Sequence, residues 1–227
     1  MKYRREGSYD LVQRLAQNAD FVALQEGVQS TVVDAPNLTY RYFAEGYASA
    51  ERQTGVEIRS RFPATVSCAL SFREPWLRTP KAALAAHYAI GTEGLLLISL
   101  HAVNFTFWVT DLQRQFAALG NLIDAHAGPT IVIGDFNNWN AYRQAVIETF
   151  ARRHGLEIAR FEPDGRSRHL GVPVDGLLQR GFEVLNASAL LTDASDHHPI
   201  LAVLRLWEPA SSGAGNRAED GAPAPAR

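Results

Sequence analysis

Five places in the sequence put a carboxylate, imidazole or carboxamide side chain where a short apolar run begins or ends. These residues are Glu26, His101 with Asn104, Asp135 with Asn137, Asp175, and Asp196 with His197. Charged side chains are seldom buried without a partner or a metal ion. Five such places in one chain indicate that these side chains converge on a single site.

The residue types match what phosphoryl transfer needs. A hard divalent cation such as Mg²⁺ takes oxygen ligands, which Glu26 and Asp196 can supply. An imidazole paired with a carboxylate, such as His197 with Asp175, can stabilise an oxyanion or move a proton. A carboxylate beside an amide, as in the segment GDFN, can orient a water molecule that attacks phosphorus. Phosphoryl chemistry asks mainly for such positioning and for charge neutralisation.

Each of these residues also has an ordinary structural explanation. Asp135 follows a glycine and can cap a turn, Glu26 can mark where a strand meets water, and His101 can be a hydrogen-bonded core histidine. Asp175 and Asp196 both lie near a proline and can belong to turns. The functional interpretation therefore depends on the whole set.

The elements that would position these side chains are mostly apolar strands, with helices between some of them. Helical periodicity predicts helices at 9–20, 111–128 and 141–155. Apolar runs predict strands at 21–26, 54–63, 64–72, 82–90, 94–104, 130–136, 174–179, 182–191 and 199–207. Several neighbouring strands are expected to be antiparallel, which favours a mixed α/β (α+β) sandwich over a doubly wound parallel sheet. The alternating run ATVSCALSF predicts that Cys68 is packed in the core.

Composition bounds the remaining possibilities. The chain has 227 residues, of which 46% are hydrophobic and 20% charged, and this is typical of a globular protein. The net charge of -2 gives no global attraction to nucleic acid, and the single cysteine excludes an internal disulfide. We expect one catalytic domain at 1–208 and a disordered Ala/Gly/Pro/Ser-rich tail at 209–227. We also expect a cytoplasmic protein without stable membrane insertion, and no segment indicates a protein partner.

The segments LQE, GDFN and SDHHP, in this order, resemble motifs of the endonuclease/exonuclease/phosphatase superfamily, which has the DNase I-like fold. The segments HAVNF and VDGLLQRG lie where that superfamily has its middle histidine or tyrosine motif and its D-x-x-(F/L) strand. The resemblance extends from Asp20 to Trp207 and is greatest to a bacterial subgroup without an assigned activity. It implies a four-layer α/β/β/α sandwich with the site at one edge of two packed sheets.

The resemblance also implies a role for each matching residue on the metal and water side of the site. Glu26 matches the metal-binding glutamate, and Asp196 matches a further carboxylate on the metal side. Asp135 matches the aspartate that activates water, and Asn137 matches its partner, which contacts the phosphate. The implied cofactor is Mg²⁺, with Mn²⁺ as the alternative.

A second group of residues matches the substrate side. His197 resembles the histidine that stabilises or protonates the phosphoryl oxygens, and Asp175 resembles the carboxylate that orients it. His101 matches a second catalytic histidine of the nuclease and sphingomyelinase branches. Further substrate-binding candidates are Asn104, Lys81 and Trp139. Lys81 can contact a phosphate or be a solvated charge, and Trp139 can stack on a base or pack in the core.

The beginning of the chain departs from the family pattern. Members of the superfamily begin with a buried strand that ends in a tryptophan or similar residue and then an asparagine, which helps to hold the metal. Nothing in this sequence matches that strand, and MKYRREGSYDLV resembles the segment after it. We expect the natural gene to encode such a strand upstream, and we expect the strand at 21–26 to lack one neighbour without it.

These observations predict a Mg²⁺-dependent phosphodiesterase acting on a phosphoester substrate, with nucleic acid as the leading class. Two alternatives stay open. One is a phosphomonoesterase or a phosphodiesterase of lipid head groups, and the other is a non-catalytic binding protein disabled by loss of the first strand. Arg166 and Arg168, in the segment DGRSRHLG, can contact a phosphate from a flexible loop.

Overall fold

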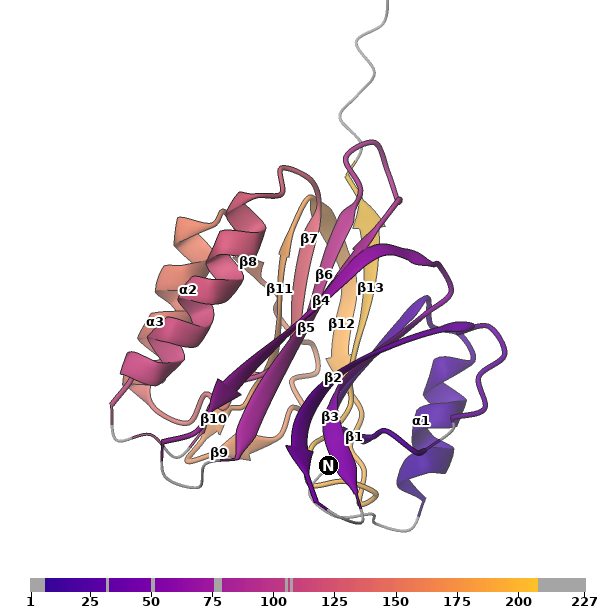
Figure 1. Ribbon diagram of the computed structural model, residues 1–227, viewed down its shortest axis with the longest axis horizontal. Coiled ribbons are helices and arrows are strands. Elements are labelled where there is room, and N and C mark those ends of the chain that lie inside the picture. Colours follow the sequence, from indigo (N-terminus) through magenta and orange to yellow (C-terminus); the bar gives the residue numbers. More distant parts are fainter. Residues whose placement is uncertain are drawn as a thin grey trace, which may run out of the picture.

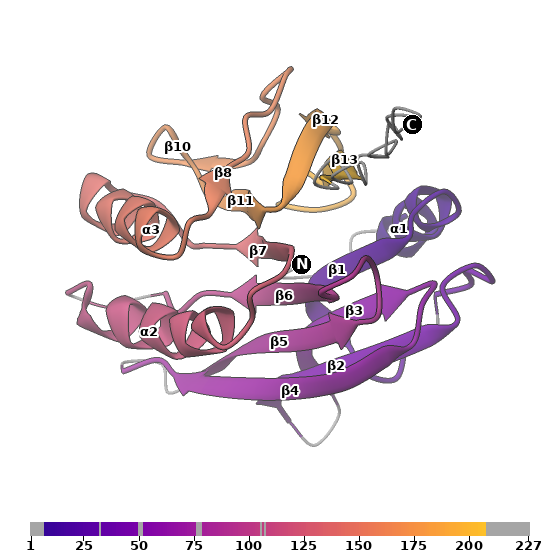
Figure 2. The ribbon, with the colours of Figure 1, turned by 90° about the horizontal axis from the view of Figure 1, so that it is seen from above.

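The computed structural model describes residues 7–31, 33–49, 52–75, 79–104, 106 and 108–207, and the tail predicted at 209–227 lies outside these residues. Two β-layers pack face to face, and helices cover the outer face of each (Figures 1 and 2). Along one direction the layers follow the order α, β, β, α. The predicted mixed α/β fold is confirmed.

The larger layer is a six-stranded sheet with the order β4-β5-β6-β7-β11-β8. Its strands are β4 (Ala64–Arg73), β5 (Pro80–Tyr88), β6 (Leu95–His101), β7 (Thr130–Asp135), β11 (Asp175–Arg180) and β8 (Glu157–Ile158). Only β6 and β7 pair in parallel among these described strands, and α2 (Thr110–Asp124) connects them. Helices α2 and α3 (Ala141–Arg153) cover the outer face, where Leu112 and Phe116 join a buried cluster with Leu100 and Val132.

The second layer contains two smaller sheets. One has the order β1-β3-β2, formed by β1 (Phe21–Val28), β3 (Gln53–Ser60) and β2 (Tyr40–Ala48), and α1 (Ser8–Ala16) lies on its outer side. The other is the hairpin of β12 (Phe182–Ala189) and β13 (Ile200–Leu206). Val56 and Ile58 of β3 pack against Leu84 and Leu97 of the larger sheet, which forms the core between the layers. A short hairpin of β9 (Arg168–His169) and β10 (Val172–Pro173) precedes β11.

Strands β1 and β13 each have an open edge in the described part of the chain. β1 pairs only with β3, and β13 pairs only with β12. All eight residues of β1 are partly exposed, and Leu201 and Val203 of β13 are 37% and 56% exposed. A continuous cavity of about 1850 Å³ is lined by both strands and extends to the ends of β6 and β7. Among the described strands, β1 therefore has β3 as its one hydrogen-bonded neighbour, as expected for a strand that lacks a partner on its other side.

Two features differ from the sequence-based expectations. Strand β2 was not predicted, because YRYFAEGYA interrupts its aromatic residues with Glu45 and Gly46 and so lacks an apolar run. The prediction that Cys68 is a core thiol was wrong, because this residue is exposed. Cys68 lies on β4, the edge strand of its sheet, which has a hydrogen-bonded neighbour on one side only. No helix in the described residues combines the length and apolar character needed to cross a bilayer.

Candidate active site

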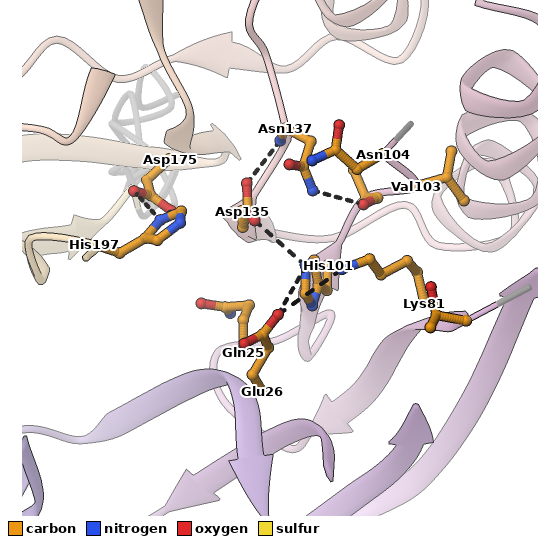
Figure 3. A network of polar contacts seen from close by, with 12 residues as sticks. Gln25, Glu26, Lys81, His101, Val103, Asn104, Asp135, Asn137, Asp175 and His197 are labelled. Atoms are coloured by element: carbon orange, nitrogen blue, oxygen red, sulfur yellow. Dashed lines mark hydrogen bonds and ion pairs between the residues drawn. The ribbon is translucent and has the colours of Figure 1, made fainter. Parts of the chain in front are cut away.

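The pairing of three central strands places three predicted site residues in one row. β6 and β7 run in parallel, so their carboxyl ends lie side by side and His101 pairs with Asp135. β11 runs antiparallel to β7 and begins where β7 ends, so Asp175 also pairs with Asp135. All three residues are buried, with 6–8% of their surface exposed. Figure 3 shows their side chains at this shared edge of the sheet.

The segment after β7 fixes the carboxylate of Asp135. Gly134 has φ 147°, and a Cβ atom at this position would lie 2.0 Å from the carbonyl oxygen of Leu100, so the site requires glycine. Asn137 has φ 47° and donates its backbone N–H to Oδ1 of Asp135 at 2.7 Å. Its side-chain amide donates to the carbonyl of Ala102 at 2.8 Å. Oδ2 of Asp135 is left facing His101 Nε2, at 3.4 Å.

A histidine from the loop before β13 completes this part of the site. Nδ1 of His197 lies 2.8 and 3.0 Å from the two carboxylate oxygens of Asp175, and its backbone N–H donates to Ser195 Oγ at 3.1 Å. Ligand atoms of Asp135, Asp175 and His197 all lie within 4.8 Å of one another. Residues from three separate segments of the chain thus form one compact cluster.

The environment sets a different protonation state for each member of the site. Burial and then the charge of Asp175 raise the pKa of Asp135 to about 6. Burial alone would lower the pKa of His197, but the hydrogen bond and charge of Asp175 and the charge of Asp135 raise it to about 9. Burial and the nearby Lys81 ammonium hold the pKa of His101 well below its usual value. Near pH 7.5, a basic carboxylate therefore lies beside an imidazolium and a neutral imidazole.

Glu26 and Lys81 reach the site from the other side of His101. Lys81 Nζ lies 2.7 Å from His101 Nε2, and Glu26 Oε1 lies 3.9 Å from both of these atoms. Glu26 has φ 56°, and the register between β1 and β3 shifts between Leu24 and Gly27. This bulge in β1 gives the glutamate its backbone conformation at the site, as bulges next to active sites commonly do.

The sequence interpretation overlooked Glu74, which lies beneath Lys81. This carboxylate is 1% exposed, and its Oε1 lies 3.9 Å from Lys81 Nζ and accepts the backbone N–H of Asn104 at 2.8 Å. Its other oxygen accepts a hydrogen bond from the Thr79 hydroxyl. Glu74 follows the apolar run ATVSCALSF, so it carries the same signal that identified Glu26.

Arg143 was also overlooked, and its helical position gave no signal. The side chain is fully buried on α3 and donates Nε–H to the carbonyl of Asn137 at 2.6 Å and a second N–H to the carbonyl of Val103. Burial lowers its pKa to about 10. Arg143 thereby holds together the loops that follow β6 and β7, which carry site residues. Its guanidinium also lies over the ring of Trp139, 5.5 Å from the centroid.

The remaining predicted residues lie around the cluster. Trp139 donates its indole N–H to Asn104 Oδ1 at 2.9 Å, so these two substrate-binding candidates are joined to each other. Asp196 is exposed and lines the same cavity, next to His197 in the chain. The two arginines considered for phosphate contact are instead paired with Asp164: Arg166 at 2.8 Å and Arg168 at 2.7 Å.

The donor set fits a hard divalent cation. Oxygens of Glu26 and Asp135 both approach His101 Nε2, at 3.9 and 3.4 Å, and Asp175 adds a third carboxylate nearby. Burial, and then the charge of Asp175, raises the pKa of Asp135, so the two neighbouring carboxylates repel each other when both are ionised. Mg²⁺ and Mn²⁺ prefer carboxylate oxygens and would relieve this repulsion.

Comparison with known proteins identifies the family of this chain. The sequence profile of the Endonuclease/Exonuclease/phosphatase family matches residues 3–197. The chain belongs to this family. A UPF0294 protein of Vibrio cholerae is 38% identical over 165 residues, which are 72% of this chain and 59% of that protein. The chain thus matches less than two thirds of that relative's length.

Solved structures of this family share the fold. A family protein from Leptotrichia buccalis superposes with a TM-score of 0.71 over 91% of this chain and 95% of its own, at 14% identity. Sphingomyelinase C from Streptomyces griseocarneus gives a TM-score of 0.62 over 88% of this chain and 93% of its own, at 17% identity. At this level of identity the two structures establish a common architecture.

Proposed function

We propose that this protein is a metal-dependent phosphodiesterase. The observation that carries the proposal is the cluster of Asp135, Asp175 and His197 within 4.8 Å at the end of the central strands. A carboxylate and an imidazole whose pKa values are pushed to about 6 and about 9 form a base and an acid that coexist at neutral pH. This combination suits in-line attack of water on phosphorus.

Each protein group has a distinct part in the proposed reaction. Asp135 accepts a proton from the attacking water while phosphorus bonds to that water oxygen and releases the ester oxygen, which takes up a proton from solvent. Asn137 holds the carboxylate in place through its backbone N–H. His197 binds Asp175 through Nδ1, so its Nε2–H is directed to a phosphoryl oxygen whose charge grows during attack. His101 is neutral and adds a polar contact, while Lys81 adds positive charge beside it.

A bound cation would complete the charge balance. We propose Glu26 as the principal ligand of Mg²⁺ or Mn²⁺ and Asp196 as a further carboxylate on that side. The metal would supply charge neutralisation on the phosphoryl oxygens. Glu74 sets the position of Lys81 and of the backbone at Asn104, which lie beside this part of the site.

The site supports cleavage of a phosphodiester bond more strongly than it supports any one substrate class. The fold alone does not choose a substrate, since one architecture hosts many activities. Nucleic acid was the leading class from the sequence, but Arg166 and Arg168 are engaged by Asp164 and are not arranged to follow a polyanionic backbone. Sphingomyelinase C shares the fold, and its name assigns a lipid head group to that protein. Both classes of phosphodiester therefore belong in the test.

The deciding experiment is turnover of bis(para-nitrophenyl) phosphate in a Mg²⁺ titration. We expect metal-dependent release of nitrophenol that chelation by EDTA abolishes, with little turnover of the monoester para-nitrophenyl phosphate. A panel of plasmid DNA, RNA and sphingomyelin then separates the substrate classes. Tight binding of any of these without turnover at any metal concentration would favour the binding-protein alternative instead.

A further inference from the structure

Strongly exposed apolar side chains gather at the end of the molecule that holds the site. In the described part of the chain, the large apolar side chains that are at least 70% exposed are Trp108, Tyr142, Leu170, Leu191 and Trp207. The first four lie in the loops or first helical turn beyond the site ends of the strands, and we call these four residues the apolar rim. Single exposed apolar residues are ordinary, whereas several around one site are not.

Contacts join the segments that carry the two aromatic members of the apolar rim to the site. Trp108 precedes α2 and Tyr142 lies in the first turn of α3. These two segments are connected by a hydrogen bond from Arg143 to Thr106 Oγ1 at 3.4 Å. Arg143 in turn lies over the ring of Trp139, which lines the site cavity. The segments that carry Trp108 and Tyr142 are therefore connected, through Arg143, to the wall of the site.

The two leucines extend the apolar rim around the cavity. The ring of Trp139 meets the ring of His169 edge to face at 6.5 Å, and Leu170 follows at the turn of the β9–β10 hairpin. Leu170 itself lines the site cavity. Leu191, in the loop after β12, lies close to the segment before this hairpin, because a Cβ atom added at Gly165 would lie 3.2 Å from Leu191 Cδ2. Leu170 thus brings the rim to the cavity, and Leu191 lies on a neighbouring segment.

Charged side chains near the apolar rim are engaged in ion pairs. Asp111 beside Trp108 pairs with Arg114 at 3.2 Å, and Asp164 before the hairpin pairs with both Arg166 and Arg168. Nucleic-acid binding draws most of its affinity from cationic side chains that contact phosphates, and these pairs offer few. Tryptophan and tyrosine favour the boundary between apolar and aqueous phases, because their rings are amphipathic.

We propose that the apolar rim binds to the surface of a zwitterionic phospholipid layer and presents the phosphodiester of a lipid head group to Asp135 and His197. The inference rests on the proposed phosphodiesterase function. Four side chains on separate segments can enter the head-group region without any helix spanning the layer. Because the two carboxylates and three guanidinium groups of these ion pairs leave a net charge of only +1, binding of the rim to the layer is expected to change little with salt.

The test is co-sedimentation of the full chain with phosphatidylcholine vesicles. Trp108→Ala combined with Leu191→Ser, at two rim residues that do not line the site cavity, should weaken vesicle binding at least tenfold, because each large apolar side chain that leaves water changes an equilibrium constant by about that factor. Trp207→Ala is the matched control. Trp207 is 73% exposed but lies at the far end of β13, where its backbone N–H donates to Gly181, and it should bind vesicles like wild type.

Turnover of bis(para-nitrophenyl) phosphate should be equal in the wild type, the rim variant and the control, because the rim does not contact the reacting atoms. If the wild type shows no such turnover, the proposed function is overturned. The vesicle experiment would still test whether the rim binds a phospholipid layer. The rim inference is overturned if wild type does not sediment with the vesicles, or if the rim variant binds them as tightly as Trp207→Ala. It is also overturned if the rim variant loses affinity for a single-stranded oligonucleotide instead.

Discussion

Replacing Asp135 with asparagine should abolish turnover and stabilise the metal-free protein. A carboxyl pKa raised from 3.8 to about 6 makes the ionised form about 3 kcal/mol less favourable in the folded protein than in the unfolded chain. The attraction of His197 and Lys81 is already included in that balance. Asparagine has the same shape, carries no charge, and keeps an oxygen to accept the backbone N–H of Asn137.

The pH dependence of this stabilisation follows from the two pKa values. Below pH 3.8 the carboxyl is protonated in both states, so the penalty is absent. It grows as the pH rises toward about 6 and is constant above that value. In EDTA at pH 8, Asp135→Asn should therefore raise the melting temperature by roughly 6–12 °C, since 1 kcal/mol corresponds to about 2–4 °C for a chain of this size. At pH 5 the increase should be about half as large.

A second aspartate gives a matched control of opposite sign. Hydrogen bonds from Arg166 lower the pKa of Asp164, so its ionised form stabilises the fold and Asp164→Asn should lower the melting temperature at pH 8. Turnover with Mg²⁺ should fall at least a hundredfold in Asp135→Asn, because a positioned general base contributes ~10²–10⁴ in rate. The reasoning is refuted if Asp135→Asn melts below wild type at pH 8, or if it keeps near-normal turnover.

Four further results are expected. His197→Ala should lower turnover at least a hundredfold with an unchanged circular dichroism spectrum, and near-normal activity would remove His197 from the mechanism. In wild type, kcat/KM should rise as Asp135 ionises near pH 6 and fall as His197 loses its proton near pH 9, and a flat profile from pH 5 to 10 would contradict these roles. Glu26→Gln should raise the Mg²⁺ concentration for half-maximal rate more than it raises KM for the substrate, because a carboxamide is a poorer ligand for a hard cation. An unchanged metal titration would exclude Glu26 as a ligand. Extending the chain upstream with an apolar strand that ends in asparagine should raise the melting temperature and also tighten Mg²⁺ binding, since such a strand can pair with the open edges of β1 and β13. Equal melting temperatures and equal Mg²⁺ affinities of the two forms would show that the strand is dispensable.

The sequence predicted the row of site residues because buried strands leave a clear trace. A polar side chain directly after an apolar run identified His101 on β6 and Asp135 on β7, and a polar side chain beside an apolar run identified Asp175, the first residue of β11. Their contact required only that β6 and β7 run in parallel and that β11 return beside β7. The pairing of His197 with Asp175 was predicted from their chemistry, and the structure places them 2.8 Å apart.

Other features depend on tertiary context that local patterns do not encode. β2 forms because β3 and the larger sheet offer it partners, although its own sequence lacks an apolar run. Cys68 follows an alternating pattern, yet its strand lies at an edge, and alternation alone does not report which strands are central. Arg143 is recognisable as a structural cation only when the loops after β6 and β7 converge on its guanidinium.

Residues that are unfavourable for stability, by their buried charge or their backbone conformation, are concentrated at the site. This concentration supports a functional role for the site. Two carboxylates are buried beside each other, and Glu26 and Asn137 both adopt φ values that side chains other than glycine seldom take. The cost of about 3 kcal/mol for ionising Asp135 is a substantial part of the 5–15 kcal/mol by which a typical domain is stable. A fold selected for stability alone would place a neutral side chain there, as asparagine would show. Retaining the carboxylate is reasonable if its basicity is used, and a cation and a phosphoester that neutralise the cluster would recover part of that free energy on binding.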